Sequence, residues 1–258
     1  MNLTEEQILN NWNNLLERIK DNFKDERQEK LLSLYEDLGD RMMMAPASGI
    51  EHFHNCFAGG YVDHVLRVMD CTERLYIQWE EMGADMSGYT KEEIMFCALN
   101  HDLGKAGDIS NDYYIPNPSE WHRKNQGKIY DPNPNIQNMT VPHRSIWLLS
   151  KYAIQFSQNE MIGILTHDGV YDSSNDAYLK PWGKEKALWN NLPIVLHHAD
   201  HMASRIEYES WKNKDAVRSA FNTKQKFKQK PSAKRVSISS VEKGSPAQDM
   251  FKDLFGEG

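Results

Sequence analysis

The chain has 258 residues, of which 40% are hydrophobic and 26% are charged, and its formal net charge is −7. This composition is typical of a globular protein with enough apolar residues for a core, and it argues against a fibrous or disordered chain. No apolar run reaches the roughly 18 residues that a transmembrane helix needs, so no membrane span is expected.

The charge is unevenly distributed along the chain. Residues 212–258 hold 11 basic and 5 acidic side chains, whereas residues 1–211 hold 19 basic and 32 acidic ones, a net charge of −13. Within 212–243 the net charge is +8. An acidic body repels a nucleic-acid backbone and a basic stretch attracts one. We therefore predict that residues 212–244 form a basic, flexible linker that can make weak contact with DNA.

The cysteines and the first residues indicate a cytoplasmic protein. Three cysteines, an odd number without CxxC spacing, fit a reducing compartment and argue against a thiolate zinc site. The opening sequence MNLTEEQILNNW is acidic and amphipathic, unlike the basic and apolar regions of a signal peptide.

Taken in chain order, apolar residues at three-to-four spacing predict helices over residues 3–38, 60–82, 91–103, 142–156, 159–166 and 184–211. APASG at 45–49 interrupts the pattern, and Thr90 with Glu93 predicts a capping box for the third of these helices. Strand signals are sparse, so the expected fold class is all-α. We expect residues 1–40 to pack as helices on a core domain of residues 41–211.

Residues 107–140 have no helical period and are rich in proline and asparagine. Such a long irregular segment inside a compact domain is usually functional or disordered, and its aromatic residues argue against disorder. A short β-hairpin is the expected structure. Trp121, His122 and Arg123 within it offer an aromatic plane beside basic groups, which suits stacking a base and holding its phosphate. The alternative is that these aromatic residues simply pack on the helices.

The stretch LNHDLGKAGD, residues 99–108, places a histidine beside an aspartate at a predicted helix end. Similar polar residues recur among aliphatic ones in other predicted helices, and the set is His64, His101, Asp102, His143, His167 and Asp200. Isolated polar groups are costly to bury, and imidazoles with carboxylates are what divalent transition metals accept. A single buried histidine is more often structural, but recurrence on separate helices favours a site for Mn, Fe, Co, Ni or Zn. The other histidines are expected to orient ligands or to be structural: His52, His54, His122, His197, His198 and His201.

The order His64, His101-Asp102, Asp200 resembles that of the HD-domain metal-dependent phosphohydrolases, an all-α family of helical bundles. HFHNCFAGGYVDHVLRV followed by ALNHDLGK is similar to the versions in HD-type 3′–5′ exonucleases and HD-type nucleotide phosphodiesterases. The resemblance covers about residues 50–210. With His143 and His167 added it looks like the binuclear subgroup, which implies that Asp102 bridges two ions. The 107–140 insertion is outside the common core, and Asp168 stands where some binuclear members have a second histidine.

The chemistry expected of such a site is phosphoester hydrolysis by a metal-activated hydroxide. Lys105, just past Asp102, is the candidate cation for the charge that develops on phosphate, and the alternative is a lysine at a helix end. Arg144 and Arg205 are further candidates for holding phosphate, or else surface ion-pair partners. Asp168 is a candidate proton relay, or an orienting or capping residue.

The last residues turn apolar again. QDMFKDLF resembles the peptides that bind sliding clamps, which predicts a short binding segment over 245–258 that uses Gln248, Phe251, Leu254 and Phe255. The alternative is a tail that folds back on its own domain or drives dimerisation.

The leading hypothesis is a phosphohydrolase acting on a nucleotide or a related nucleic-acid metabolite. A 3′–5′ exonuclease tethered to a clamp during DNA replication is the second, supported by the basic tail and opposed by the acidic body. An HD-type di-iron oxygenase and a non-catalytic binding module are the others. Oxygen consumption would favour the oxygenase, and a protein purified without metal would favour the binding module.

Overall fold

The structure is a computed structural model, and it describes residues 2–181, 183, 185 and 187–213. These residues are mostly helical, which confirms the all-α expectation. The longer helices are α1 (Glu5–Asn22), α2 (Asp25–Asp37), α4 (Gly60–Glu81), α5 (Lys91–Asn100), α7 (Val141–Lys151), α8 (Gln158–Thr166) and α10 (Leu192–Lys212). The shorter ones are α3 (Gly39–Met44), α6 (Glu120–Gln126) and α9 (Asp176–Leu179), with 3-10 turns at Leu103–Ala106, Gly169–Tyr171 and Ser173–Asn175. The expected basic linker and clamp-like peptide lie outside the described residues, apart from 212 and 213.

The N-terminal segment expected to be helical over 3–38 is divided into two helices. Thr4 and Gln7 form a capping box at the start of α1, and the helix ends at Phe23, which is extended and fully buried. Asp25 follows with a positive φ of 51°, so the chain turns before α2 continues. α1, α2 and α3 share one hydrophobic core with the rest of the described helices.

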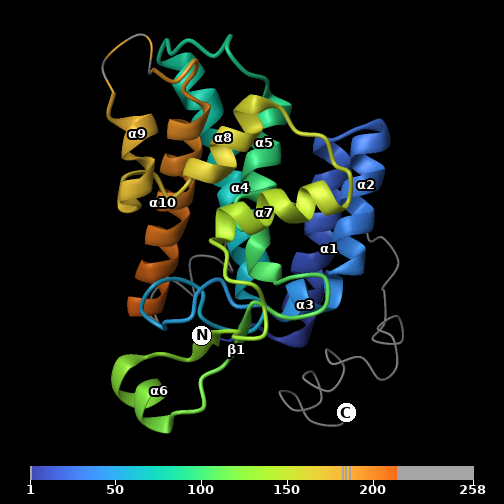
Figure 1. Ribbon diagram of the computed structural model, residues 1–258, viewed down its shortest axis with the longest axis vertical. Coiled ribbons are helices and arrows are strands. Elements are labelled where there is room, and N and C mark those ends of the chain that lie inside the picture. The colour runs from blue at the N-terminus through green and yellow to red at the C-terminus, as the bar shows by residue number, and fades with distance from the viewer. Residues whose placement is uncertain (1, 182, 184, 186, 214–258) are drawn as a thin grey trace.

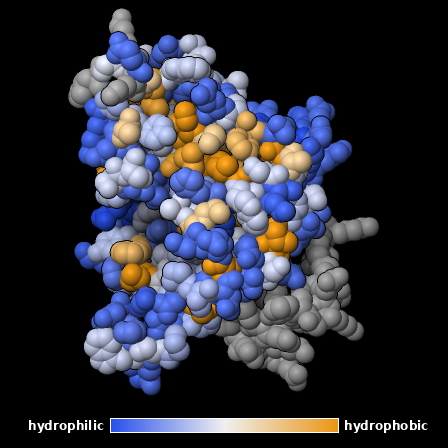
Figure 2. All heavy atoms as spheres, in the orientation of Figure 1, coloured by the Kyte–Doolittle hydropathy of each residue, from blue (hydrophilic) through white to orange (hydrophobic). Residues whose placement is uncertain are grey.

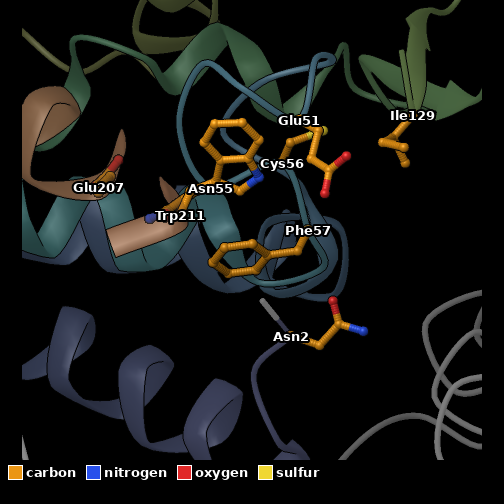
Figure 3. A pocket seen from close by; sticks show the side chains of 8 residues that line it. All are labelled: Asn2, Glu51, Asn55, Cys56, Phe57, Ile129, Glu207 and Trp211. Atoms are coloured by element: carbon orange, nitrogen blue, oxygen red, sulfur yellow. The ribbon is translucent and has the colours of Figure 1, made fainter. Parts of the chain in front are cut away.

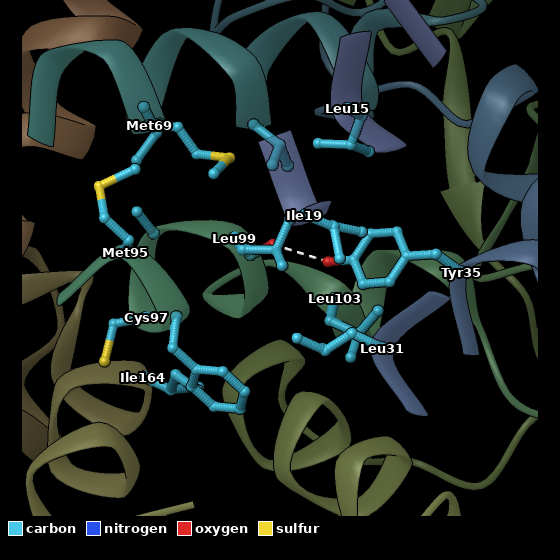
Figure 4. Close-up of a cluster of buried hydrophobic side chains, with 14 of the residues drawn as sticks. Leu15, Ile19, Leu31, Tyr35, Met69, Met95, Cys97, Leu99, Leu103 and Ile164 are labelled. Carbon is cyan, nitrogen blue, oxygen red and sulfur yellow. Dashed lines mark hydrogen bonds between the residues drawn. The ribbon is translucent and has the colours of Figure 1, made fainter. Parts of the chain in front are cut away.

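The core of the molecule lies between α4, α5, α8 and the N-terminal helices. Figure 4 shows Leu15 and Ile19 of α1 facing Leu99 of α5, with the Tyr35 ring of α2 beside them. The buried Tyr35 hydroxyl donates to the Leu99 carbonyl at 2.9 Å, so this phenol keeps a partner inside the core. In Figure 1, α1 and α2 lie on one side of the bundle and α10 on the other, with α4 and α5 between them.

Most predicted helices are found within a few residues of the expected bounds. The Thr90–Glu93 capping box begins α5, and a second one, Ser157 with Glu160, begins α8. The last helix differs: it starts at Leu192, not at residue 184. Pro193 in its first turn explains the later start, because a proline there has no backbone N–H to contribute and fits only the beginning of a helix.

The 107–140 segment contains the expected hairpin, with a short helix in its connection. β1 (Tyr114–Pro116) pairs antiparallel with β2 (Tyr130–Pro132), and α6 lies between them. The hairpin is docked on the segment that precedes α4, because the Gly49 carbonyl accepts from the amides of Ile129 and Tyr130 at 3.0 and 3.1 Å. A Cβ at Gly49 would come within 2.8 Å of the Tyr130 carbonyl oxygen, so this approach requires glycine.

The surface follows this arrangement. On the face seen in Figure 2, hydrophilic residues cover the hairpin end, and hydrophobic ones gather in the upper half around α8, where Met161 is 41% exposed. Among the described helices, none combines the length and the hydropathy needed to cross a bilayer.

Candidate metal centre

Four helices bring polar side chains to one buried point. His64 lies on α4, His101 and Asp102 follow the last residue of α5, His167 follows the last residue of α8, and Asp200 lies in the middle of α10. α4 packs against α5 and α10, and α8 packs against the same two helices. His64, His101, Asp102 and His167 are all buried.

Two of the histidines are held in the same way at their helix ends. Nδ1 of His101 lies 2.9 Å from the Ala98 carbonyl, and Nδ1 of His167 lies 2.8 Å from the Ile164 carbonyl. A carbonyl can only accept, so each Nδ1 carries a proton and Nε2 is the nitrogen left to bind a metal. That is the tautomer in which an imidazole binds a metal through Nε2.

The distances around His64 fit a single ion. Its Nε2 lies 3.2 Å from Oδ1 of Asp200, 3.4 Å from Nε2 of His101 and 3.6 Å from Oδ2 of Asp102. Metal bonds of about 2.1 Å at right angles place neighbouring donor atoms about 3.0 Å apart. Small side-chain shifts would therefore bring these four donors onto one cation.

Asp102 faces two sets of donors with its two oxygens. Oδ2 faces His64 and His101, the latter at 3.4 Å, whereas Oδ1 lies 3.7 Å from Nε2 of His167. His101, Asp102 and His167 form one group of possible metal ligands, and His64, His101 and Asp200 form another. Asp102 is thus placed between two positions at which a cation could bind.

Glu207 supports His64 from behind. Nδ1 of His64 lies 3.1 Å from Oε2 of the buried Glu207, whose Oε1 accepts from Nε of Arg67 at 3.2 Å. A carboxylate on the far nitrogen fixes the ring orientation and makes Nε2 a better donor. Sequence reasoning missed Glu207, although it follows Asp200 by seven residues, two turns along the same helix face.

His54 was also missed as a member of this site. One of its ring nitrogens forms a group with His64 and Asp102, in which the donor atoms all lie within 4.8 Å of one another. It comes from the irregular segment between α3 and α4, where no periodicity tells which side chains point inward. Of the sequence signals, only its place two residues from another histidine, in HFH, set it apart.

Lys105 adds a positive charge to the cluster. It lies in the 3-10 turn after Asp102, and its Nζ donates to Oδ2 of Asp102 at 2.6 Å. Its side chain is 12% exposed. The lysine therefore reaches the same carboxylate oxygen that faces His64 and His101.

Charges inside the cluster shift its pKa values strongly. Burial opposes protonation of His64, but Glu207 and Asp200 outweigh it and raise the pKa of His64 to about 10. His167 is raised to a pKa of about 9 against its burial, chiefly through Asp102 and Asp168. Burial also opposes ionisation of Asp102, yet Lys105 and His101 hold its pKa well below the usual range. His54 is the exception, because burial, His64 and Lys105 all lower its pKa and keep the ring neutral.

No family model, curated protein or solved structure matches this chain. The case for a metal site therefore rests on the geometry of these side chains. Buried histidines and aspartates form a cluster that could hold a metal ion, and its donor set of imidazoles and carboxylates suits a divalent transition metal.

Two predicted residues lie at or beyond the edge of this cluster. His143 is exposed at the start of α7, and its Nδ1 lies 2.6 Å from the hydroxyl of Thr140, the residue that caps the helix. The structure does not bring it into any of the three groups of possible ligands among the described residues. The Asp168 side chain is 49% exposed, with Oδ1 3.9 Å from Nε2 of His167.

The two arginines predicted to hold phosphate make other contacts. Arg144 is buried and donates to the carbonyls of Gln137 and Met139 at 3.0 and 3.2 Å, so it fixes the segment before α7. Arg205 is exposed on α10, and its guanidinium lies over the Tyr208 ring, 4.8 Å from its centroid.

Trp121, His122 and Arg123 lie on α6, at the far end of the hairpin in Figure 1. Trp121 is 60% exposed and its ring meets that of His122 edge to face at 5.5 Å. Arg123 donates to the Asn117 carbonyl and so closes the base of α6. The exposed indole of Trp121 is accessible for stacking on a base. Trp121 is not packed on the helices, which was the alternative expectation for the aromatic residues of this segment.

A cavity of about 190 Å³ adjoins the cluster beyond Glu207. Figure 3 shows the rings of Trp211 and Phe57 on its walls, with Glu51 at one side. Its lining residues are Asn2, Glu51, Asn55, Cys56, Phe57, Ile129, Glu207 and Trp211.

Proposed function

We propose that this chain is an HD-domain metal-dependent phosphohydrolase that cleaves a phosphoester bond of a nucleotide or a related metabolite. The observation that carries the proposal is the convergence of His64, His101, Asp102 and Asp200 with donor distances of 3.2–3.6 Å, together with Lys105 at the same carboxylate. The order of these residues is that of the family which the sequence resembles.

The residues present fit a divalent transition ion such as Mn, Fe, Co, Ni or Zn. Three imidazoles and two carboxylates lie within reach of one another, and the Nδ1 atoms of His64, His101 and His167 each have an acceptor. A divalent ion held by these residues would lower the pKa of a bound water toward about 7, so that hydroxide would be available at neutral pH. Asp102 has Oδ2 near His64 and His101 and Oδ1 near His167, so it could bind one metal ion or two.

Lys105 supplies the positive charge that phosphoester cleavage needs. Its ammonium is held beside the cluster by Asp102. Of the three basic residues predicted to contact phosphate, Lys105, Arg144 and Arg205, it is the one that pairs with a residue of the cluster. Positive groups fixed at the point where charge develops stabilise the transition state without reorganising. Arg144, occupied by carbonyls of its own loop, is not needed for this role.

The test is metal analysis combined with an activity screen of the full chain. Metal-depleted protein is loaded separately with Mn, Fe, Co, Ni or Zn and incubated with nucleoside phosphates, cyclic nucleotides and short oligonucleotides. We expect a divalent ion to bind and phosphoester hydrolysis to follow. Asp102→Asn should lower the rate at least about 100-fold while leaving the helical circular-dichroism spectrum unchanged, because the buried carboxylate faces both sets of donors.

Two results would contradict the proposal. A metal-loaded protein that leaves the whole panel intact would remove the hydrolase assignment, and oxygen consumption by the iron form would replace it with an oxygenase.

Asp131→Asn on the hairpin serves as the matched control for Asp102→Asn, since Asp131 also pairs with a lysine three residues away at 2.6 Å but lies outside the cluster.

A further inference from the structure

We propose that His54 is a fifth protein donor to the ion held by His64, His101, Asp102 and Asp200, and that it makes this site selective for nitrogen-preferring metals. The inference rests on the metal-binding part of the proposed function. It assigns a ligand that neither the sequence pattern nor the helix ends predict.

The first support is an unpaired polar atom. Nε2 of His54 is buried and is among the few buried side-chain nitrogens of the described residues that have no hydrogen-bond partner. Leaving such an atom without a partner costs about 1–3 kcal/mol, so proteins rarely bury one without a purpose. A buried imidazole nitrogen without a partner, on a residue grouped with His64 and Asp102, is what an incoming cation could use.

The second support is position. The His54 ring lies beside that of His64, with centroids 4.7 Å apart and planes tilted by 37°. Its donor nitrogen lies within 4.8 Å of those of His64 and Asp102. Opposite donors around one ion lie about 4.2 Å apart when the bonds are about 2.1 Å long. His54 is therefore within a small side-chain movement of the same ion.

His64 decides that one ion, and not two, would take these donors. Its Nδ1 is occupied by Glu207, which leaves Nε2 as its single free nitrogen. A nitrogen lone pair binds one cation at a time. Since the group with His54 and the group with His101 and Asp200 both contain His64, they describe parts of one coordination sphere.

The backbone around His54 is fixed, which suits a ligand. The next residue, Asn55, donates its amide to Oδ2 of Asp63 on α4 at 2.9 Å, and its carbonyl accepts from the amides of Ala47 and Phe57 at 3.1 and 2.9 Å. The hairpin adds hydrogen bonds to the same segment at Gly49. A donor on a loop held in this way is positioned before the ion arrives.

Selectivity follows from the donor count. With His54 the ion has three imidazole nitrogens and two carboxylate oxygens, which leaves one position of an octahedron for water or substrate. Imidazole suits Fe, Ni, Cu and Zn, whereas Mg and Mn prefer oxygen ligands. Removal of His54 should therefore weaken Co²⁺ and Ni²⁺ binding more than Mn²⁺ binding.

The experiment compares His54→Ala and His54→Asn with the wild-type full chain, all stripped of metal and titrated with Co²⁺ and Mn²⁺ against a chelating indicator. We expect both variants to bind Co²⁺ at least about 10-fold more weakly and Mn²⁺ less than about 3-fold more weakly. The visible spectrum of the Co²⁺ form should also change, because the ion loses a nitrogen donor. His52→Ala is the matched control, since His52 is exposed two residues away.

Unchanged Co²⁺ affinity and an unchanged Co²⁺ spectrum in a folded His54 variant would overturn the inference. The asparagine variant keeps a polar group of similar reach and guards against a failure of the alanine variant to fold. If the wild type hydrolyses phosphoesters and the His54 variants bind Co²⁺ as it does, the inference fails and the proposed function stands. If Co²⁺ binding depends on His54 but no substrate is cleaved, the inference holds and the proposed function fails.

Discussion

At the scale of single residues, Lys105 and a metal ion would compete for the same atom. Oδ2 of Asp102 accepts from Nζ of Lys105 at 2.6 Å and also lies 3.4–3.6 Å from the Nε2 atoms of His101 and His64. We predict that Lys105→Ala binds Co²⁺ as tightly as the wild type or more tightly, because a competing cation is gone. Hydrolysis should nevertheless fall about 100-fold, since a positive group at the developing phosphate charge is lost.

The measurement is Co²⁺ affinity and kcat on the same preparations. Lys128→Ala is the control, because Lys128 makes a similar pair with Asp131 at 2.6 Å on the hairpin. A Co²⁺ affinity more than 10-fold weaker in Lys105→Ala would show instead that the lysine helps to build the site.

Five of the six predicted metal ligands lie close together in the structure, whereas His143 on α7 lies outside the cluster. The sequence placed His64, His101, Asp102, His167 and Asp200 in one site, and the structure brings them together. A helix end or a helix face fixes the direction of a side chain, so spacing is informative there. His54 lies in an irregular segment without such a rule, and Glu207 needed the additional knowledge that His64 presents Nδ1 to α10.

At the scale of elements, α5 and α8 are joined where they begin and deliver histidines where they end. Glu93, the partner of Thr90 in the capping box of α5, accepts from the Thr90 amide at 2.9 Å, from the hydroxyl of Ser157 at 2.6 Å and from the Asn159 side-chain amide at 3.2 Å. Ser157 is itself the residue that caps α8. One carboxylate thus stabilises the first turns of both helices.

We predict that Glu93→Gln lowers the free energy of unfolding by about 1–2 kcal/mol at neutral pH, because the caps of two helices lose a charged acceptor. Burial opposes ionisation of Glu93, but hydrogen bonds from Ser157, Thr90 and Asn159 outweigh it and lower its pKa below the ordinary 4.5. Its ionised form therefore stabilises the fold above that value, and the stabilisation is lost as the pH falls through the folded-state pKa. The difference from wild type should shrink as the pH falls below about 4.5.

Urea unfolding at several pH values measures this difference. The control is Glu81→Gln at the exposed end of α4, which should change little. A difference that grows toward low pH would contradict the assignment.

The elements themselves were predictable to different degrees. Apolar periodicity predicted α4, α5, α7 and α8, and the Thr90–Glu93 capping box marked the start of α5, because those signals are local. The late start of α10 was missed, since residues 184–191 resemble a helix in composition and only Pro193 marks the true beginning. The short α6 was missed as well: Ser119 caps it by accepting from the His122 amide, a signal hidden among prolines and asparagines.

At the scale of the whole molecule, Arg27 links the N-terminal helices to α8, the helix that His167 follows. It donates to Glu160 at 2.7 Å and to the Gln155 carbonyl at 2.9 Å, and its guanidinium lies 4.3 Å above the Phe96 ring. The Glu160 side chain is fully buried. The N-terminal helices are therefore tied to α8 by a charge pair as well as by the shared apolar core.

We predict that Arg27→Met lowers the free energy of unfolding by about 3 kcal/mol, because a buried carboxylate loses its counter-charge. For a chain of this size that corresponds to a fall in Tm of roughly 6–12 °C. The double variant Arg27→Met/Glu160→Gln should recover part of the loss in a thermal-unfolding measurement. No loss in the single variant, or no recovery in the double one, would mean that the pair contributes little.

The charges around Asp102 have a practical consequence for the isolated protein. Asp102, Asp200 and Glu207 are matched by Lys105, by Arg67 and by histidines that readily take up a proton, so the cluster supplies its own counterions. Folding should not depend on cation loading, in contrast to small zinc-folded domains that unravel in chelator. One preparation can therefore be emptied and refilled with different metals, and each form compared on the same scaffold.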